Sequence, residues 1–559
     1  MRTKVIQTNF TGGEISPTLA GRIDLDKYYK ACSSAENVII MPHGGLKRRD
    51  GLKKCTDSYI NKYARFEAFT FSTTQSYLIA VSTDYIDIYK DGELMASVVS
   101  PFTTVAMVDE FDTVQSADTM IFVHQDLAPR KLVRSGSDTS WTISTITLTN
   151  IPKYNFGSGD EDVWSSSRGW PRTVTFHGGR LWFGGSKSKI SSVWGSKSND
   201  FFNFDMGTGL DDEGIFDTLD TDQYNQIEGI FSGRNLQVFT TGGEFYNKTT
   251  VITPSDSVWS MQTAYGSVRI RPVMIDGSTL FISRNRKSLR QFIYNFTEDA
   301  YVSINVLLMS EHLASNGIKT IDVQRATLDN ISDLVYVIDN SGVCLVLNVM
   351  RTEDILGWTK WTTDGQFIDV AVVGDSAYFL VKRGDNYYIE ILTSGTYTDH
   401  NTTGTGTNIT GIDTNEEGYT LTRPHKVVLD DAVQADITPD AGGVITFARS
   451  CSKFEVGLGY SVNIETMPIT FNGPDGQQIN SRKRVLKTTL RIYNTRGAYV
   501  QGKLLRDRKF PIVLNQTEDP YTGALLITHL GYNRINTVTV TQDDPLPFHL
   551  LQIESETEA

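Results

Sequence analysis

Several features that would place this 559-residue chain in a familiar biochemical class are absent. Its four cysteines, Cys32, Cys55, Cys344 and Cys451, form neither a CxxC pair nor a dense framework, which indicates folding in a reduced, cytosolic environment. The first residues lack the apolar run of a signal peptide, and no stretch approaches the roughly 20 apolar residues that a membrane helix needs. We therefore expect no membrane insertion.

Sequence motifs of common enzyme classes are also missing. No Gly-x-Ser-x-Gly elbow, His-Glu-x-x-His pair or Walker loop occurs, and the eight histidines are scattered. Propeller sialidases carry a repeated Ser-x-Asp-x-Gly-x-Thr-Trp turn, but its nearest counterpart, Ser137–Trp141, lacks the glycine and does not recur. We predict that the protein is not an enzyme and has no catalytic, cofactor-binding or metal-ligating residues.

The charge balance limits the kind of nucleic-acid contact that is expected. Lys and Arg number 52 against 65 Asp and Glu, which gives a formal net charge of -13. Binding nucleic acid over a whole surface depends on Lys and Arg neutralising phosphates, so this balance argues against such a protein. Weak, sliding contact with a nucleic acid stays compatible with it.

Most of the chain follows a recurrent pattern of two apolar strands joined by a tight polar turn. Seven such units occupy residues 77–89, 113–133, 173–194, 227–246, 273–293, 334–347 and 370–391. Their period of about 48 residues is the size of a four-stranded propeller blade. One four-stranded sheet cannot bury both faces by itself, whereas blades around an axis cover one another. The pattern favours a β-propeller, with a β-sandwich as the alternative.

Different patterns flank the repeat and define the predicted domains. Residues 24–38 lack Gly and Pro and carry apolar residues at helical spacing, so we predict a helix there. Residues 393–414 consist almost wholly of Thr, Gly, Asn, Ser and Asp, which predicts a flexible linker or loop, or an extension ordered by a partner. The length exceeds what one hydrophobic core supports. We expect a mainly β protein with an N-terminal platform part at 1–64, a propeller-like domain at 65–392, a linker at 393–418 and a C-terminal platform part at 419–559.

The densest acidic cluster runs from Leu210 to Asp222 and includes Asp211 and Asp212. Paired carboxylates can catalyse glycoside hydrolysis or bind calcium, but the spacing does not match an EF-hand loop. A solvated inter-blade loop, a cation site and a catalytic site are the three interpretations, in decreasing order of preference.

Two basic runs contrast with the acidic background: Lys47, Arg48 and Arg49, and Arg482, Lys483 and Arg484. Such runs are usually solvated strand faces or loops. The alternative is a docking surface for an acidic neighbour or a local contact with a DNA backbone in a channel. These six residues, with Asp211 and Asp212, are the candidate docking or channel contacts.

Several segments, in a fixed order along the chain, resemble one known family. They are Asn9–Pro17, Asp26–Tyr29, Asn37, Pro42–Gly51, His177–Gly184, Ser198–Phe204, Asp211–Asp212, Ile227, Thr241–Phe245, Val456–Tyr460, Glu465–Pro468, Ser481–Arg484, Leu490–Gly497 and Gln542–Pro547. Together they resemble the tail hub or nozzle proteins of podoviruses, the short-tailed bacteriophages. In that family the protein forms the tubular component below the adaptor ring.

The resemblance implies a platform made jointly from both ends of the chain, with a β-propeller between them. It implies a homohexameric ring in the virion, folded first in the bacterial cytoplasm, with the phage adaptor or head-to-tail connector above and tail fibres or tailspikes at the side. Double-stranded DNA would pass through the lumen during ejection without sequence-specific binding.

The alternative function is a receptor- or carbohydrate-binding propeller of a phage tail, with glycan cleavage as a variant of it. A binder of this kind should retain affinity for glycans or host cells as an isolated monomer, whereas a hub should act only in complexes. A third interpretation, a scaffold propeller of the host, predicts no phage neighbours.

Overall fold

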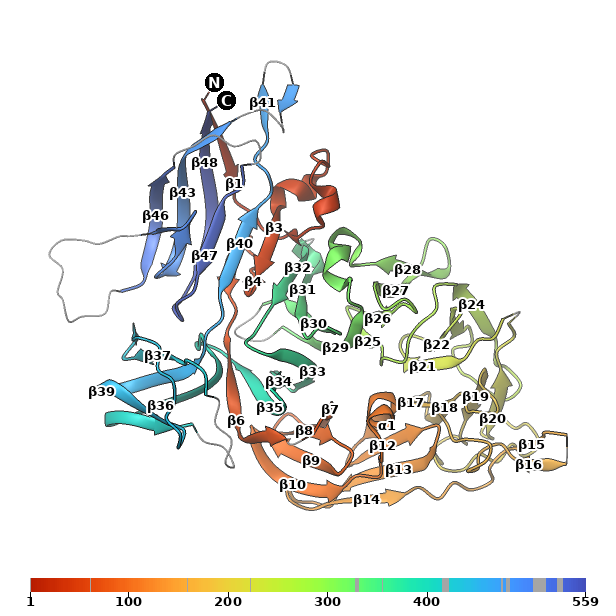
Figure 1. Ribbon diagram of the computed structural model, residues 1–559. Helices are drawn as coiled ribbons and strands as arrows, with labels where there is room; N and C mark the ends of the chain where they lie inside the picture. The colour runs from red at the N-terminus through yellow and green to blue at the C-terminus, as the bar shows by residue number, and fades with distance from the viewer. Residues whose placement is uncertain are drawn as a thin grey trace. The chain divides into compact units, whose positions relative to one another are not determined.

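The computed structural model describes residues 2–60, 62–157, 159–221, 223–326, 331–353, 355–414, 422–473, 476–478, 483–505, 519–529 and 536–558 (Figure 1). The chain divides into two compact units. The first, called the platform unit below, contains residues 1–61, 309–316 and 324–559. The second, called the repeat unit, contains residues 62–308 and 317–323. Both are mainly β, as predicted, and none of the described helices has the length and apolar character of a membrane-spanning segment.

The repeat unit contains five consecutive four-stranded antiparallel sheets, each built from neighbouring segments of the chain. They are β7 (Arg65–Ser72), β8 (Gln75–Val81), β9 (Tyr85–Lys90) and β10 (Glu93–Val99); β11 (Asp112–Ser116), β12 (Thr119–His124), β13 (Leu127–Arg134) and β14 (Trp141–Thr145); β17 (Thr173–His177), β18 (Arg180–Gly184), β19 (Ser192–Gly195) and β20 (Ile215–Thr218); β21 (Ile227–Ser232), β22 (Leu236–Thr240), β23 (Glu244–Asn247) and β24 (Trp259–Thr263); and β25 (Val273–Ile275), β26 (Ser278–Ile282), β27 (Leu289–Asn295) and β28 (Ala300–Asn305). The unit also has α1 (Val105–Glu110), the hairpin β15 (Lys153–Asn155) and β16 (Asp160–Asp162), and most of β29 (Ile318–Gln324).

Tight turns set the register of these hairpins. Gly178 and Gly179, between β17 and β18, have φ values of 57° and 74°. Asp276 and Gly277, between β25 and β26, have φ values of 44° and 71°. Two successive residues with positive φ make the turn whose twist matches a two-residue β-hairpin, which explains the glycines at these positions.

Each sheet of the repeat unit packs against the next through an apolar cluster. Phe69 and Tyr77 of the first sheet share a core with Phe122 of the second. Trp182 of the third sheet packs in one core with Leu236 of the fourth. The second and third sheets, and the fourth and fifth, are joined in the same way. Consecutive sheets that bury one another's faces are the packing of a β-propeller-like repeat.

The platform unit holds the last two predicted repeats. These are β30 (Asp333–Asp339), β31 (Cys344–Met350) and β32 (Ile355–Trp361), then β33 (Gln366–Val373), β34 (Ser376–Arg383) and β35 (Asn386–Thr393). They also share a core, to which Tyr336, Trp361 and Phe379 contribute. All seven predicted units therefore coincide with antiparallel hairpins. The compact-unit boundary nevertheless falls inside the predicted 65–392 domain, because β32 pairs with β2 (Gly13–Glu14) and β3 (Ala31–Glu36), and β35 pairs with β6 (Gly51–Ile60).

Strands from both ends of the chain share the sheets of the platform unit. One sheet contains β1 (Arg2–Gln7), β4 (Val38–Ile40), β5 (Leu46–Arg48), β43 (Arg484–Thr495), β46 (Tyr521–Thr528) and β48 (His549–Glu558). The sheet of β30 to β32 continues through β2 and β3 to β40 (Val462–Thr466), β47 (Thr539–Gln542), β44 (Tyr499–Val500) and β45 (Lys503–Leu504). The sheet of β33 to β35 continues through β6 to β36 (Asp399–Asp413), β39 (Val444–Leu458), β37 (Lys426–Leu429) and β38 (Ala432–Val433). The short elements are η1 (Pro17–Leu19), η2 (Asp26–Lys30), η3 (Leu308–Ala314), η4 (Arg351–Glu353), β41 (Phe471–Gly473) and β42 (Gly476–Gln478). Of these, η3 begins one residue before the 309–316 segment of this unit.

The predicted helix at residues 24–38 is wrong. Only Asp26–Lys30 is helical, as the 3₁₀ turn η2, and β3 and β4 follow it. Cys32 and Ala35 are fully buried in the core that β40 and β47 also line, so pairing with β40 outweighs the helical spacing of the apolar residues. Asn37, with a φ of 56°, interrupts the segment between the two strands.

The predicted linker is also wrong over residues 399–413, which form β36. This strand pairs with β39, and Ile409 and Ile412 pack against a core that includes Phe454 and Val456. The composition of the segment did not reveal this strand, because the partner strand β39 supplies most of the apolar surface. Threonine, which is frequent in the segment, also suits a half-buried strand. Residues 415–418 of the predicted linker lie outside the described residues.

Candidate functional site

A densely hydrogen-bonded site of the platform unit surrounds Arg48 and Arg49, which both have 0% exposure. The two residues stand at the end of β5, in the turn that leads into β6. The aromatic ring of Tyr460 lies between β39 and β40, with its centroid 4.3 Å from the Arg48 guanidinium carbon and 3.6 Å from that of Arg49. Stacking of this kind stabilises desolvated guanidinium groups. We call Asn37, Arg48, Arg49, Asp399, Tyr460 and Gln542 the junction cluster.

Arg49 forms a bidentate ion pair with Asp399. Its Nη1 and Nη2 atoms lie 2.8 and 2.6 Å from the two carboxylate oxygens, and both side chains are fully buried. Its Nε donates to Oδ1 of Asn37 at 3.0 Å. Burial opposes the charge of Arg49, but the Asp399 carboxylate more than offsets it and raises the pKa of the guanidinium. The guanidinium therefore keeps its charge, and the pair joins the N-terminal segment to β36.

Arg48 joins the same segment to the C-terminal part of the chain. Its Nη1 donates to Oε1 of Gln542 at 2.8 Å, and its Nη2 donates to the backbone oxygen of Tyr460 at 2.8 Å. The Tyr460 hydroxyl in turn donates to the backbone oxygen of Arg49 at 2.6 Å. Five segments, around residues 37, 48–49, 399, 460 and 542, are thus fixed to one another by charge-assisted hydrogen bonds.

The burial of Arg48 and Arg49 corrects their interpretation as docking or channel contacts. A guanidinium with no exposed surface cannot reach a partner or a DNA phosphate. Only Lys47 of this run is partly exposed, with its Nζ 3.5 Å from the Asp50 carboxylate. The sequence shows the basic run but not the aromatic ring, carboxylate and amide that enclose it. Asp399 was missed altogether, because it stands in the segment interpreted as a linker.

The second basic run is also mostly engaged within the platform unit. Lys483 is buried, its Nζ donates to the backbone oxygen of Ile469, and burial lowers its pKa. It is therefore not a docking residue, and its interpretation is corrected. Arg484, at the start of β43, pairs with Glu558 of β48 at 2.7 Å. Arg482 lies outside the described residues.

Asp211 and Asp212 lie in the loop between β19 and β20, within one sheet of the repeat unit and not between two sheets, whereas residues 219–221 of the acidic cluster follow β20 and lead to the next sheet. Asp211 and Asp212 are exposed, and the buried Arg180 donates from Nη2 to the backbone oxygen of Asp211. The Glu213 carboxylate accepts the backbone N–H groups of Thr208, Gly209 and Leu210 at 2.6–2.8 Å, and these bonds lower its pKa. Within the described part of the chain, no group of three or more His, Cys, Asp or Glu is placed to hold a metal ion.

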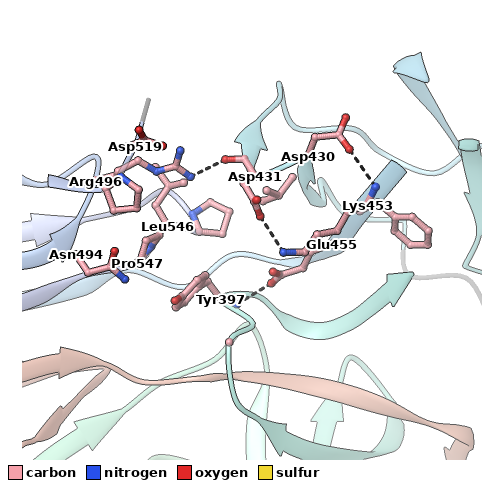
Figure 2. Close-up of a pocket in the computed structure, with 15 residues that line it drawn as sticks. Tyr397, Asp430, Asp431, Lys453, Glu455, Asn494, Arg496, Asp519, Leu546 and Pro547 are labelled. Carbon is pink, nitrogen blue, oxygen red and sulfur yellow. Dashed lines mark hydrogen bonds and ion pairs between the residues drawn. The ribbon is translucent and has the colours of Figure 1, made fainter. Parts of the chain in front are cut away.

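A polar cleft of about 330 Å³ lies beside β39 in the platform unit (Figure 2). Lys453 pairs with Asp431 at 2.9 Å, and Arg496 donates to the backbone oxygen of Asp431 at 2.6 Å. Glu455 accepts from the backbone N–H of Tyr397 at 2.7 Å, and burial raises its pKa. Asp430 accepts the backbone N–H groups of Ser452 and Lys453, which lowers its pKa. These charges connect β39 to neighbouring loops and give the cleft two carboxyl groups with opposite pKa shifts.

Comparisons with known proteins give only structural likenesses. No protein-family model and no curated protein sequence matches the chain. Similar solved structures include the WD40 domain of Neurospora crassa Pan2, with 8% identity, 62% of this chain and 90% of that chain covered, and a TM-score of 0.32. The RRP9 WD40 repeats are 10% identical, with 62% of this chain and 100% of that chain covered and a TM-score of 0.38. BBS1N in complex with ARL6DN is also 10% identical, with 62% of this chain and 98% of that chain covered and a TM-score of 0.36.

Proposed function

We propose that the chain is a structural subunit of the tail hub, or nozzle, of a short-tailed bacteriophage. Six copies would form a ring in the virion that conducts double-stranded DNA during ejection. The ring would bind the adaptor protein above and carry tail fibres or tailspikes at its side. In this proposal the protein works by its geometry and not by catalysis.

The junction cluster is the observation that carries this proposal. Five of its members, Asn37, Arg48, Arg49, Tyr460 and Gln542, belong to the sequence segments that resemble the podovirus hub family. Those segments are up to about 500 residues apart, yet their side chains meet in one buried site. A resemblance carried by surface residues would say little about architecture, whereas these residues hold the joint platform together.

The mechanical demands of a conduit fit the way the platform unit is connected. Its first strand β1 pairs with its last strand β48, and β3 pairs with β40, so both chain ends are held by backbone hydrogen bonds over their length. The buried ion pair between Arg49 and Asp399 adds a contact that salt screens little. A subunit built in this way can resist force on a ring without coming apart at its termini.

The exposed charges of the platform suit a wall that guides DNA without holding it. Arg2 and Arg484 both pair with Glu558, and Lys4 pairs with Glu554 at 2.7 Å. Cations that are already paired with carboxylates release few counterions from DNA, so the affinity for phosphates stays low. We expect the purified chain to retain no duplex DNA in a mobility-shift assay at physiological salt.

Electron microscopy of the purified chain mixed with the adaptor ring of the same virion tests the proposal. We expect rings with six-fold symmetry and a central hole, stacked on the adaptor. Mass photometry should give a mass of six chains for the same rings. Dispersed single chains under all conditions, with or without the adaptor, would contradict the proposal.

Glycan binding or cleavage is the second candidate function, and the cleft beside β39 is the observation that favours it. Glycosidases need one protonated and one ionised carboxyl group, and the pKa values of Glu455 and Asp430 are shifted in these two directions. The test is hydrolysis of host surface polysaccharide by the isolated chain. Activity that is lost in Glu455→Gln would favour this function over the hub, and no activity would reject cleavage.

A further inference from the structure

One basic segment of the repeat unit has no part in the functions considered above. From Gly277 to Thr297 the chain carries four Lys or Arg and no Asp or Glu, although its formal net charge is -13. The four cations, in and just after the turn between β26 and β27, are Arg284, Arg286, Lys287 and Arg290. The first three of them are exposed. A local reversal of charge of this kind attracts an anionic partner.

The turn that carries these cations is held by its own polar groups. The Asn285 Oδ1 atom accepts the backbone N–H of Lys287 at 2.9 Å and the Ser283 hydroxyl at 2.6 Å. Arg286 has a φ of 59°, and its backbone oxygen accepts the N–H of Ile318 at 2.7 Å. The cations therefore project from a fixed backbone, which lowers the entropy lost when a ligand binds.

Most of the positive charge on this turn is not neutralised. Among the described residues, the side chains of Arg284 and Lys287 form no ion pair and no hydrogen bond. Arg286 donates from Nη1 to the backbone oxygen of Ile318 at 3.3 Å, and not to a carboxylate. Glu244 lies close enough to Arg290 to interact with it, but burial raises the pKa of Glu244 to about 7. Its carboxyl group therefore carries only part of a charge at neutral pH.

Two exposed tyrosines lie beside the cations. Tyr265 is 43% exposed, and its ring centroid is 3.2 Å from the guanidinium carbon of Arg290. Tyr224 is 74% exposed. Tyrosine and arginine are both enriched on surfaces that bind partners, because they offer apolar area together with polar groups.

Backbone contacts bring the tyrosines and the basic turn into one surface. Arg284 donates its backbone N–H to the oxygen of Gly266 at 3.0 Å. Gly266 lies against Thr241, since a Cβ atom added to it would collide with the Thr241 backbone oxygen. The Thr241 hydroxyl in turn donates to the backbone oxygen of Tyr224 at 3.4 Å. We call the following six residues the basic–aromatic patch: Tyr224, Tyr265, Arg284, Arg286, Lys287 and Arg290.

We propose that the basic–aromatic patch binds an acidic polysaccharide, a chain of sugar rings that carries carboxylate or phosphate groups. Arg and Lys pair with both of these anions, and the tyrosine rings offer flat apolar area to a sugar ring. All six residues belong to the repeat unit of one chain. The inference therefore goes beyond the hub proposal and does not depend on a ring.

Charge density favours a polysaccharide over a nucleic acid. Single-stranded nucleic acid carries a phosphate at every nucleotide, and its binding sites track the backbone along a cationic groove. Here the cations are concentrated at one turn of a chain with a net charge of -13, so the rest of a nucleic acid would meet acidic surface. A polysaccharide whose anions are separated by neutral sugars needs only the local patch.

A patch of exposed ions should bind weakly in a single chain, because water screens exposed ion pairs. If six copies form the proposed ring, the same polymer can contact several patches, and multivalency then raises the affinity. Weak binding by one chain is thus compatible with a hub that acts in complexes.

Fluorescence anisotropy with labelled oligogalacturonate and labelled phosphomannan fragments tests the proposal on the full-length chain. These two probes distinguish carboxylate from phosphate as the anion. At about 0.01 M salt the Debye length is about 30 Å, so weak contacts between charges are measurable. We expect binding of at least one probe, and no binding of maltooligosaccharide of the same length, which has no charge.

Two variants of the patch separate the roles of charge and aromatic surface. Arg284→Gln/Lys287→Gln should weaken binding roughly tenfold or more, because two charge-assisted contacts are lost. Tyr224→Ala should weaken it roughly threefold to tenfold through loss of the stacked ring. Both changes are at exposed positions, so folding should be unaffected.

Arg234→Gln/Lys248→Gln is the matched control. Both residues are exposed at the other end of the sheet β21–β24, where the Asn235 side chain donates to the backbone oxygen of Asn247 at 3.1 Å. The control removes one Arg and one Lys, as the patch variant does, and should leave binding unchanged.

The outcomes separate this inference from the proposed function. Absence of binding to both acidic probes, or equal affinity in the wild type and in Arg284→Gln/Lys287→Gln, would overturn the patch. Binding unchanged in Tyr224→Ala would show attraction of charge alone, and tighter binding of oligothymidylate would assign the patch to nucleic acid; either result would overturn the proposal. Rings that form with the adaptor but bind no probe would leave the hub intact, whereas binding by a chain that forms no rings would contradict the hub alone.

Discussion

The platform unit and the repeat unit are both built from β-sheets, but they assemble those sheets in different ways. In the repeat unit each four-stranded sheet comes from one continuous stretch of the chain, and apolar clusters join it to its neighbours. In the platform unit a single sheet draws strands from residues 2–7, 38–48 and 484–558, and buried ions join the segments. Strands that follow one another in the chain find their partners without special contacts. Segments that are far apart in the sequence need a contact that is satisfied in only one arrangement.

Buried ion pairs suit the second task because of their energetics. An ion pair in an apolar interior gains little net stability over an apolar pair, but a misplaced partner leaves an uncompensated charge. Arg49 and Asp399 form a fully buried pair in the platform unit and are 350 residues apart in the chain. We interpret this pair as a device that specifies which distant segments pair, and the following variants would break or sharpen that contrast.

The largest effect is expected from Asp399→Asn. The variant leaves the Arg49 guanidinium buried without its counter-charge, which costs roughly 3–5 kcal/mol of unfolding free energy. Hydrogen exchange should increase chiefly in β36, β40 and the segment around β5, and less in the repeat unit. The double variant Arg49→Met/Asp399→Leu removes both charges and should regain much of the loss. A double variant less stable than Asp399→Asn would contradict the specifying role.

The matching variant in the repeat unit is Leu236→Ala. Leu236 is fully buried in the cluster that joins the third and fourth sheets, so its truncation should cost roughly 2–5 kcal/mol through lost burial and the cavity left behind. Hydrogen exchange should rise in β17 to β24. Ile304→Ala is the control, since Ile304 is 52% exposed on β28 and should change stability little. Equal effects of the two variants would show that the apolar cluster does not connect the sheets.

The same contrast explains how much of the fold can be predicted from the sequence. The seven repeats were predicted because hairpin strands and their turns, such as Asp276-Gly277, lie within about 20 residues of one another. The segments whose structure was predicted wrongly, 24–38 and 399–413, are those whose strand partners do not follow directly across a tight turn. β3 pairs with β40 more than 400 residues away, and no local pattern reports this. The prediction relied on the helical spacing of Cys32 and Ala35, but pairing with a distant strand determines the structure of this segment.

The candidate site was predicted less well, for a related reason. The sequence shows that Arg48 and Arg49 are charged, and exposure is the common state of charged residues. Their burial depends on Asp399, Tyr460 and Gln542, which are 350 or more positions away. Tyr460 and Gln542 were recognised as part of the family resemblance, but nothing local connected them to the arginines. Asp211 and Asp212 are exposed in a loop held by local hydrogen bonds, as predicted, but this loop joins two strands of one sheet and is not the predicted inter-blade loop.

A smaller effect on stability is expected from a change in pH, and it can be assigned to a histidine of the repeat unit. Burial, with Arg269 and Arg172 nearby, lowers the pKa of His124 in the repeat unit to about 4, against an ordinary value of 6.5. Between these values the unfolded chain takes up a proton that the folded chain does not, so stability falls as pH drops below 6.5. The loss should be about 1 kcal/mol at pH 5.5.

His124→Asn should reduce this pH dependence in the repeat unit and leave the platform unit unchanged. Asparagine can accept the hydrogen bond that Asp126 donates from its backbone to Nδ1 of His124 at 3.1 Å. The matched variant is His425→Asn in the platform unit, where burial also lowers the histidine pKa to about 4. Hydrogen exchange at pH 7 and 5.5 measures both. A pH response that is the same in the wild type and in His124→Asn would exclude this histidine as its source.

The smallest effect is expected where an ion pair is exposed. Arg22 and Asp24 are 2.8 Å apart, two residues apart in the chain, with side chains 54% and 62% exposed. Water screens this pair, and it joins no distant segments, so Asp24→Asn should leave the denaturation midpoint unchanged within experimental error. Asp399→Asn makes the same chemical change at a pair with no exposure. If the two variants destabilised the protein equally, burial would not explain the contribution of the Arg49–Asp399 pair to stability. The contrast between local and distant connections would then fail.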